Sequence, residues 1–163
     1  MMSLNKENIL QLLSQIPDPE IPVITIAELG VIRDVLFNAD EIEIKITPTY
    51  SGCPAMKQME DDIKSTLKKN GFEKIKLTTV YSPPWTTDWL SAEAKEKLRA
   101  YGIAPPEHST EDKSWLSGKH KTVHCPRCKS SHTKLISQFG STACKALYQC
   151  EDCLEPYDYF KCI

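Results

Sequence analysis

The sequence lacks the features that mark several common classes of protein. Its apolar runs are far shorter than the roughly 18 residues that cross a bilayer, and Met1–Leu10 has neither the basic start nor the apolar core of a secretory signal. It also has no glycine-rich phosphate loop, no internal repeat and no low-complexity tract. These absences argue against membrane, secreted and phosphate-loop proteins, and they predict a cytoplasmic protein whose thiols stay reduced.

Histidine is also scarce, and the positive and negative charges nearly cancel. His108 is the first histidine, so residues 1–107 contain no Ser/His/Asp or Cys/His arrangement and no local base for nucleophilic hydrolysis. Charged residues make up 26% of the chain, and the net charge of −2 provides no field to attract nucleic acid. We therefore expect a soluble protein that is not catalytic alone and has no membrane or nucleic-acid partner.

The seven cysteines are an odd number and are unevenly placed, which argues against a closed disulfide framework. Cys53 stands alone, and the other six lie between Cys125 and Cys162. A chain of 163 residues has room for a domain of about 100 residues and a small module. The cysteine distribution therefore predicts two parts with different chemistry.

Apolar periodicity predicts the elements of the first part. A helix is expected over about residues 3–15, and the proline-rich segment Ile16–Pro22 ends it. A helix after Pro54, with Met56, Met59, Ile63 and Leu67 as its apolar stripe, should lead into a strand parallel to its predecessor. The expected strands are 31–37, 41–47 and 74–81, and a last short helix is expected over 91–101.

The predicted fold class is α+β. It combines a small α/β domain, residues 1–103, in which helices accompany a three-stranded mixed sheet, with an all-β module at residues 123–163. Residues 104–122 show no periodicity and are predicted to be a linker.

The all-β module contains two C-x2-C pairs separated by 21 residues, Cys125 with Cys128 and Cys150 with Cys153. Each pair directs two thiolates to one point, and two pairs complete the tetrahedron of a structural zinc site. Such a small module has little core, so metal binding supplies much of its folding free energy. Four thiolates also accept iron or an iron–sulfur cluster, so spacing alone leaves zinc and iron open.

The neighbours of these pairs have alternative interpretations. Cys144 and Cys162 are either small buried apolar residues or parts of a second metal site or transfer relay. Three histidines beside the first pair could replace a ligand, but a full set of four cysteines favours surface positions for them. They are His120, His124 and His132.

Cys53 follows the tight Ser51-Gly52 turn and precedes Pro54 at a helix start, so we expect an exposed thiol. The positive end of the helix favours a thiolate there, which suits soft-metal binding, although a buried or helix-capping cysteine is the alternative. Hydroxyl groups such as that of Thr49 could surround the sulfur. Asp18 and Glu20 could approach it if the proline-rich segment folds over the sheet, although a turn acid and a solvated acid are the simpler interpretation.

Four motifs in this order resemble the domain-of-unknown-function 59 (MIP18-like) family, whose members are associated with iron–sulfur cluster assembly. They are Asp18–Pro22, Glu28–Ile32, Thr47–Pro54 and Pro84-Trp85. With Phe139–Leu147 and Phe160–Cys162 added, nearly the whole chain resembles the D component family of the phenylacetyl-CoA epoxidases. The resemblance implies a small α/β fold and makes Cys53 a cluster-associated cysteine, with Thr49 shaping its loop.

The resemblance also implies a function and partners. It suggests an accessory subunit that assists iron–sulfur or iron centre assembly in another epoxidase component, especially the iron–sulfur reductase. A structural or docking subunit is the alternative. One cysteine cannot enclose a cluster, so a transient iron–sulfur cluster at Cys53 would be shared, labile or bridged in a homodimer.

Overall fold

The computed structural model describes residues 5–38, 40–50, 52–107 and 122–161. Contacts divide the chain into two compact units, Met1–Trp85 and Thr86–Ile163. No helix in these described ranges is both long and apolar enough to cross a membrane.

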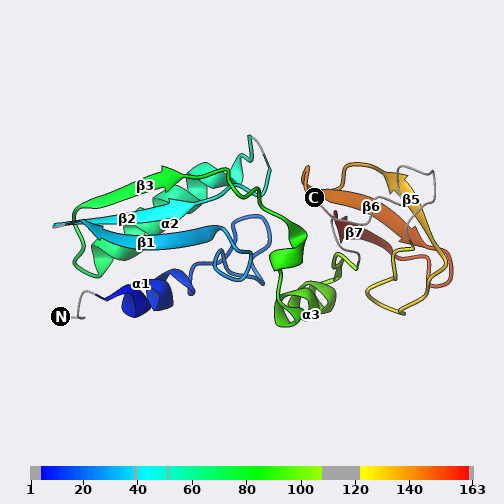
Figure 1. Ribbon diagram of the computed structural model, residues 1–163. Coiled ribbons are helices and arrows are strands. Elements are labelled where there is room, and N and C mark those ends of the chain that lie inside the picture. Colours follow the sequence, from blue (N-terminus) through cyan, green and yellow to red (C-terminus); the bar gives the residue numbers. More distant parts are fainter. Residues whose placement is uncertain (1–4, 39, 51, 108–121, 162–163) are drawn as a thin grey trace. The chain divides into compact units, whose positions relative to one another are not determined.

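The first unit contains a three-stranded mixed sheet (Figure 1). β1 (Ile32–Asn38) and β2 (Glu41–Ile46) are antiparallel, whereas β2 and β3 (Ile75–Thr79) are parallel. The parallel pair follows from the helix that crosses over between β2 and β3. This arrangement confirms the α/β part of the predicted fold class.

Two helices accompany the sheet. α1 (Lys6–Leu13) begins after Asn5, whose side chain accepts the Asn8 N–H at 2.7 Å. α2 (Ala55–Lys69) lies against one face of the sheet (Figure 1) and buries Met59, Ile63 and Leu67, as the apolar stripe predicts. Pro54 occupies the N-cap, one position before the first helical position that the sequence predicted for it.

One end of the first sheet gathers three segments that are distant in sequence. Ile32 at the start of β1 pairs with Ile46 at the end of β2, and Ile46 pairs with Thr79 at the end of β3. The segment before β1 and the segments after β2 and β3 therefore all meet at this end. Cys53 belongs to the second of these segments.

The second unit contains a four-stranded sheet in the order β4-β7-β6-β5. Its strands are β4 (Ile103–Ala104), β5 (Thr133–Ser137), β6 (Lys145–Cys150) and β7 (Pro156–Phe160). β5, β6 and β7 lie within the all-β module that the sequence predicts for residues 123–163. One core cluster packs on the face that carries Ala146 and Cys150; its other buried members are Ala104, Val123, Cys125, Tyr157 and Tyr159.

The second unit extends further toward the N-terminus than the predicted ribbon. It includes η1 (Thr87–Trp89) and α3 (Ala92–Tyr101), because α3 contacts β4 and β4 pairs in parallel with β7. Most of the predicted linker, residues 108–121, lies outside the described residues. The predicted domain boundaries at residues 103 and 123 therefore differ from the boundary between the two contact-defined units, which lies at Trp85. That residues 1–103 and 123–163 fold independently stays a prediction.

Candidate metal centre and the Cys53 segment

The two C-x2-C segments adopt the same backbone turn. The N–H of Cys125 donates to the Ser130 carbonyl, and the N–H of Cys150 donates to the Glu155 carbonyl, each at 2.9 Å. The residue after each pair takes a left-handed conformation, with φ of 63° at Lys129 and 64° at Leu154. The short spacing therefore folds both segments into equivalent knuckles.

The knuckles bring four sulfur atoms together. The Sγ atoms of Cys125 and Cys153 are 3.8 Å apart, those of Cys128 and Cys150 are 3.5 Å apart, and all four lie within 4.8 Å of one another. A tetrahedron of zinc–sulfur bonds of about 2.3 Å has edges of about 3.8 Å. The four cysteines thus have the spacing that a tetrahedral metal ion requires.

Electrostatics within this cluster favour a bound cation. The Cys153 N–H donates to the Cys150 sulfur at 3.5 Å, and backbone donation of this kind lowers the pKa of Cys150 to about 7. At Cys128 a backbone hydrogen bond involving Ser130 lowers the pKa, but the neighbouring thiols and burial outweigh it and raise the pKa to about 12. Because neighbouring thiolates repel each other, all four ionise together only around a positive ion.

Polar side chains connect the two knuckles outside the sulfur cluster. Arg127 on the first knuckle pairs with Glu155 after the second at 2.5 Å. Asp152 accepts a hydrogen bond from the Ser130 hydroxyl, and its Oδ1 lies 3.2 Å from Nδ1 of His132. These contacts hold the two cysteine pairs in register from the solvent side.

The histidines near the first knuckle are outside the sulfur cluster. His124 Nδ1 lies 2.6 Å from Glu107 and His132 pairs with Asp152. His120 lies outside the described residues. Among those described, the four cysteines are the only group of three or more His, Cys, Asp or Glu ligands gathered as a metal site requires.

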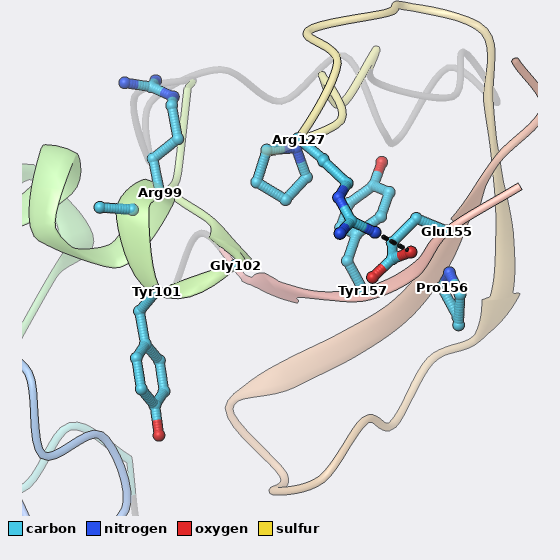
Figure 2. A pocket seen from close by; sticks show the side chains of 9 residues that line it. Arg99, Tyr101, Gly102, Arg127, Glu155, Pro156 and Tyr157 are labelled. Atoms are coloured by element: carbon cyan, nitrogen blue, oxygen red, sulfur yellow. Dashed lines mark hydrogen bonds and ion pairs between the residues drawn. The ribbon is translucent and has the colours of Figure 1, made fainter. Parts of the chain in front are cut away.

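A hollow of about 270 Å³ lies beside the knuckles, between the end of α3 and the β7 side of the sheet. Figure 2 shows the Arg127 guanidinium extended toward the Glu155 carboxylate; Tyr157 also lines the hollow. The second arginine of the hollow, Arg99, pairs with Glu96 on α3. The side chains of Arg99 and Arg127 therefore both pair with carboxylates already. The hollow lies next to the polar contacts that connect the two knuckles.

Cys53 is buried, with 8% of its surface exposed, so the expectation of an exposed thiol is wrong. Its N–H donates to the Tyr50 carbonyl at 3.3 Å, and this tight turn folds the chain back so that Cys53 is covered together with Ala55 at the start of α2. Gly52 makes the turn with φ of 78°, a conformation that favours glycine. The position directly before α2 is as predicted.

The other residues that were predicted to handle iron have different environments. Thr49 is buried at 8% exposure in the same segment as Cys53. Asp18 is buried, and its Oδ1 accepts the backbone N–H groups of Glu20 and Ile21 at 2.9 and 2.6 Å. Asp18 therefore closes a turn, while Glu20 is half-buried. Asp18, Glu20 and Cys53 do not form a ligand group of their own among the described residues.

Two family models match the two parts of the chain. The one described as "Iron-sulfur cluster assembly protein" matches residues 6–80, and the one described as "PaaD zinc beta ribbon domain" matches residues 109–161. The chain is also 52% identical over 93% of its length to a protein of Escherichia coli, of which it covers 90%. That protein is named as the D component of a "Putative 1,2-phenylacetyl-CoA epoxidase". The chain belongs to the PaaD family.

Relatives of the first unit lack the ribbon of this PaaD-family chain. An Fe–S protein maturation auxiliary factor of Bacillus subtilis is 38% identical over 57% of the chain and 92% of its own length. The crystal structure of a DUF59 domain from Bacillus anthracis is 31% identical, with a TM-score of 0.53, over 57% of the chain and 90% of that structure. The PaaD family thus joins a DUF59 fold to a zinc ribbon.

Two features of the PaaD-family chain escaped the sequence analysis. The first is the pairing of Arg127 with Glu155, which spacing alone cannot predict because the residues lie on different knuckles. The second is a hydrogen bond from Trp85 Nε1 to the Leu29 carbonyl, of 2.7 Å. The Pro84-Trp85 motif was a signal for it, since a buried indole N–H requires an acceptor.

Proposed function

We propose that this chain is an accessory subunit of the ring-1,2-phenylacetyl-CoA epoxidase system of phenylacetate degradation. In this role it assists the assembly of an iron–sulfur or iron centre in a partner, above all the iron–sulfur reductase component. The observation that supports it most is the fusion of an iron–sulfur assembly domain with a PaaD ribbon in one chain. The relative that matches 93% of the chain is named for the epoxidase, and a relative that matches 57% of the chain is named for Fe–S protein maturation.

The ribbon has a structural part in this proposal. Cys125, Cys128, Cys150 and Cys153 hold one zinc ion, because their sulfur spacing matches a zinc tetrahedron and all four positions are filled by the protein. A site with four protein ligands leaves no open position for a substrate. Zinc therefore stabilises the ribbon and takes no part in transfer.

Cys53 is the residue that handles iron in this proposal. Its thiolate binds an iron atom of the cargo; Thr49 is buried in the same segment as Cys53, and Asp18 closes the turn of the proline-rich segment. Transfer is a ligand exchange without oxidation or reduction: a recipient thiol bonds to the iron through its sulfur as the Cys53–iron bond breaks, and the proton of that thiol moves to Cys53. The remaining ligands come from a second copy or from the recipient, because the described residues around Cys53 form no ligand group.

The test is anaerobic reconstitution of the full chain with ferric iron, a thiol reductant and sulfide. The wild-type chain should develop iron–sulfur absorption in the visible range, which Cys53→Ser abolishes while zinc content stays the same. Cys144→Ser is the matched control, since Cys144 is also a buried thiol outside the zinc cluster. Equal absorption from the wild type and Cys53→Ser would contradict the proposal.

A purely structural or docking subunit of the oxygenase is the second candidate, favoured by the burial of Cys53. It predicts that Cys53→Ser leaves epoxidation unchanged. A homodimer bridged at Cys53 is a variant of the first candidate, and it predicts that cluster content and dimer fraction rise together.

A further inference from the structure

The loop between β5 and β6 presents an exposed aromatic side chain. Phe139 is 67% exposed, and Ile136, at the irregular end of β5, is 51% exposed. Single exposed apolar residues are common and need no explanation. What distinguishes Phe139 is the number of contacts that fix the loop around it.

Asp158 on β7 anchors this loop. The hydroxyl and backbone N–H of Ser141 donate to the two oxygens of the Asp158 carboxylate at 2.6 and 3.3 Å. The ammonium group of Lys145, whose side chain is 5% exposed, lies 3.8 Å from the same carboxylate. The charge of Asp158 is thus balanced within the unit, and the loop is tied to a central strand.

Gly140 permits the close approach of loop and carboxylate. A Cβ atom at this position would lie 2.2 Å from Asp158 Oδ1, so any other residue would force the Asp158 carboxylate or the loop to shift and would disturb their contact. The Gly140 N–H donates to the Lys145 carbonyl at 2.8 Å. The residue next to Phe139 is therefore fixed by steric fit and by a backbone hydrogen bond.

Lys161 fixes the aromatic ring itself. Its ammonium group lies 4.8 Å from the centroid of the Phe139 ring and donates to the Gln138 carbonyl at 3.0 Å. The Phe139 N–H donates to the Ser137 hydroxyl at 3.2 Å. An exposed ring that is held in this way loses little conformational entropy when it binds, and rigid aromatic anchors dominate many protein interfaces.

The charges beside the ring indicate the chemistry of the partner. The ammonium group of Lys161 lies over the Phe139 ring, whereas the nearby Asp158 is used within the unit. A matching surface would combine an apolar socket for the ring with carboxylates around it.

We propose that Phe139, positioned by Gly140 and Asp158, is the docking anchor for the reductase component, which presents an apolar socket with an acidic rim. This inference rests on the proposed function, because it takes the recipient of the iron–sulfur centre as the partner. It assigns to the ribbon the recognition of that recipient, separate from the chemistry at Cys53.

The test titrates the full-length, zinc-loaded chain into the purified apo-reductase by calorimetry. Phe139→Ala should weaken the dissociation constant at least about 10-fold, as loss of an aromatic anchor does. Tyr101→Ala is the matched control, because Tyr101 is also an exposed aromatic residue of the second unit, with 55% of its surface exposed, and it should bind as the wild type does. Lys161→Glu should weaken binding more than Lys161→Gln.

Gly140→Ala tests the positioning of the ring, because it keeps Phe139 but displaces the loop, and it should also weaken binding about 10-fold. Zinc content serves as the check on folding. If Gly140→Ala loses zinc, Asp158→Asn replaces it, and a similar loss of affinity is expected.

Binding and maturation separate this inference from the proposed function. Cys53→Ser should bind the reductase with wild-type affinity and fail to deliver the centre, whereas Phe139→Ala should deliver it at raised concentration. Equal affinities for the wild type and Phe139→Ala, or no binding of the wild type to the reductase, would overturn the docking inference. Either result leaves the cluster test at Cys53 to decide the function independently.

Discussion

The indole Nε1 of Trp85 donates a hydrogen bond of 2.7 Å to the carbonyl oxygen of Leu29, 56 positions earlier in the chain. Trp85 is 4% exposed and Leu29 is 3% exposed. The bond joins the segment after β3 to the segment before β1, at the end of the sheet that also includes the Cys53 segment. It therefore joins two of the three segments that meet at this end of the sheet.

Trp85→Phe should destabilise the first unit by about 1–3 kcal/mol, because the Leu29 carbonyl is left buried without its indole donor. Urea unfolding followed by circular dichroism measures the change. Tyr81→Phe is the control, since Tyr81 is 67% exposed and should change stability little. Equal unfolding midpoints for Trp85→Phe and the wild type would show that this bond is not needed.

Elemental analysis should find one zinc per chain, and Cys128→Ala or Cys150→Ala should remove it, since three thiolates bind the ion much more weakly than four. Cys144→Ala should keep the zinc, because Cys144 lies outside the sulfur cluster and contacts Thr142 Oγ1 at 3.0 Å. Iron in place of zinc after anaerobic purification would correct the identity of the metal.

Removal of the metal by a strong chelator should unfold the second unit and leave the first unit folded. The two units are separate by contacts, and the core cluster of the second includes the ligands Cys125 and Cys150. In NMR spectra of the backbone amides, the signals of residues 86–107 should lose their dispersion together with those of the ribbon, while the signals of β1–β3 stay as in the folded protein. A single transition for all residues would mean that the two units fold cooperatively.

Acid should weaken the first unit through Glu43. A hydrogen bond of 2.6 Å from Thr78, followed by one from Lys76, lowers the pKa of Glu43 from its ordinary 4.5. A carboxyl whose folded pKa is lowered contributes stability above its unfolded pKa and loses it as pH falls through the folded pKa. Glu43→Gln should therefore flatten the loss of stability below about pH 4.5 in urea titrations; an unchanged slope would contradict this.

Local patterns predicted most of the fold because each element has a local cause. Met59, Ile63 and Leu67 recur at helical spacing, and Gly102 with φ of 93° ends α3 after Tyr101 as its position predicts. The knuckles were predictable because the spacing of a cysteine pair determines the turn. The zinc ribbon and the mixed three-stranded sheet follow from these patterns.

Features that depend on distant residues could not be predicted in this way. β4 has two residues, too few for any periodicity, and exists because Ile103 and Ala104 pair with β7. The burial of Cys53 depends on how the turn at Tyr50 lies against the unit. The close approach of Gly140 to Asp158 joins residues 18 positions apart, and only the folded sheet brings them together.

The central claim is that Cys53 delivers iron or a cluster to a partner, and the iron and acid-labile sulfide content of the reductase tests it most directly. The reductase is co-expressed anaerobically with the wild-type chain, with Cys53→Ser or with Cys144→Ser, and then purified alone. The account predicts a full iron–sulfur content with the wild type and Cys144→Ser, and a content with Cys53→Ser as low as in the absence of the chain. Full iron and sulfide content with Cys53→Ser would contradict delivery by Cys53, and the chain would then be a structural or docking subunit.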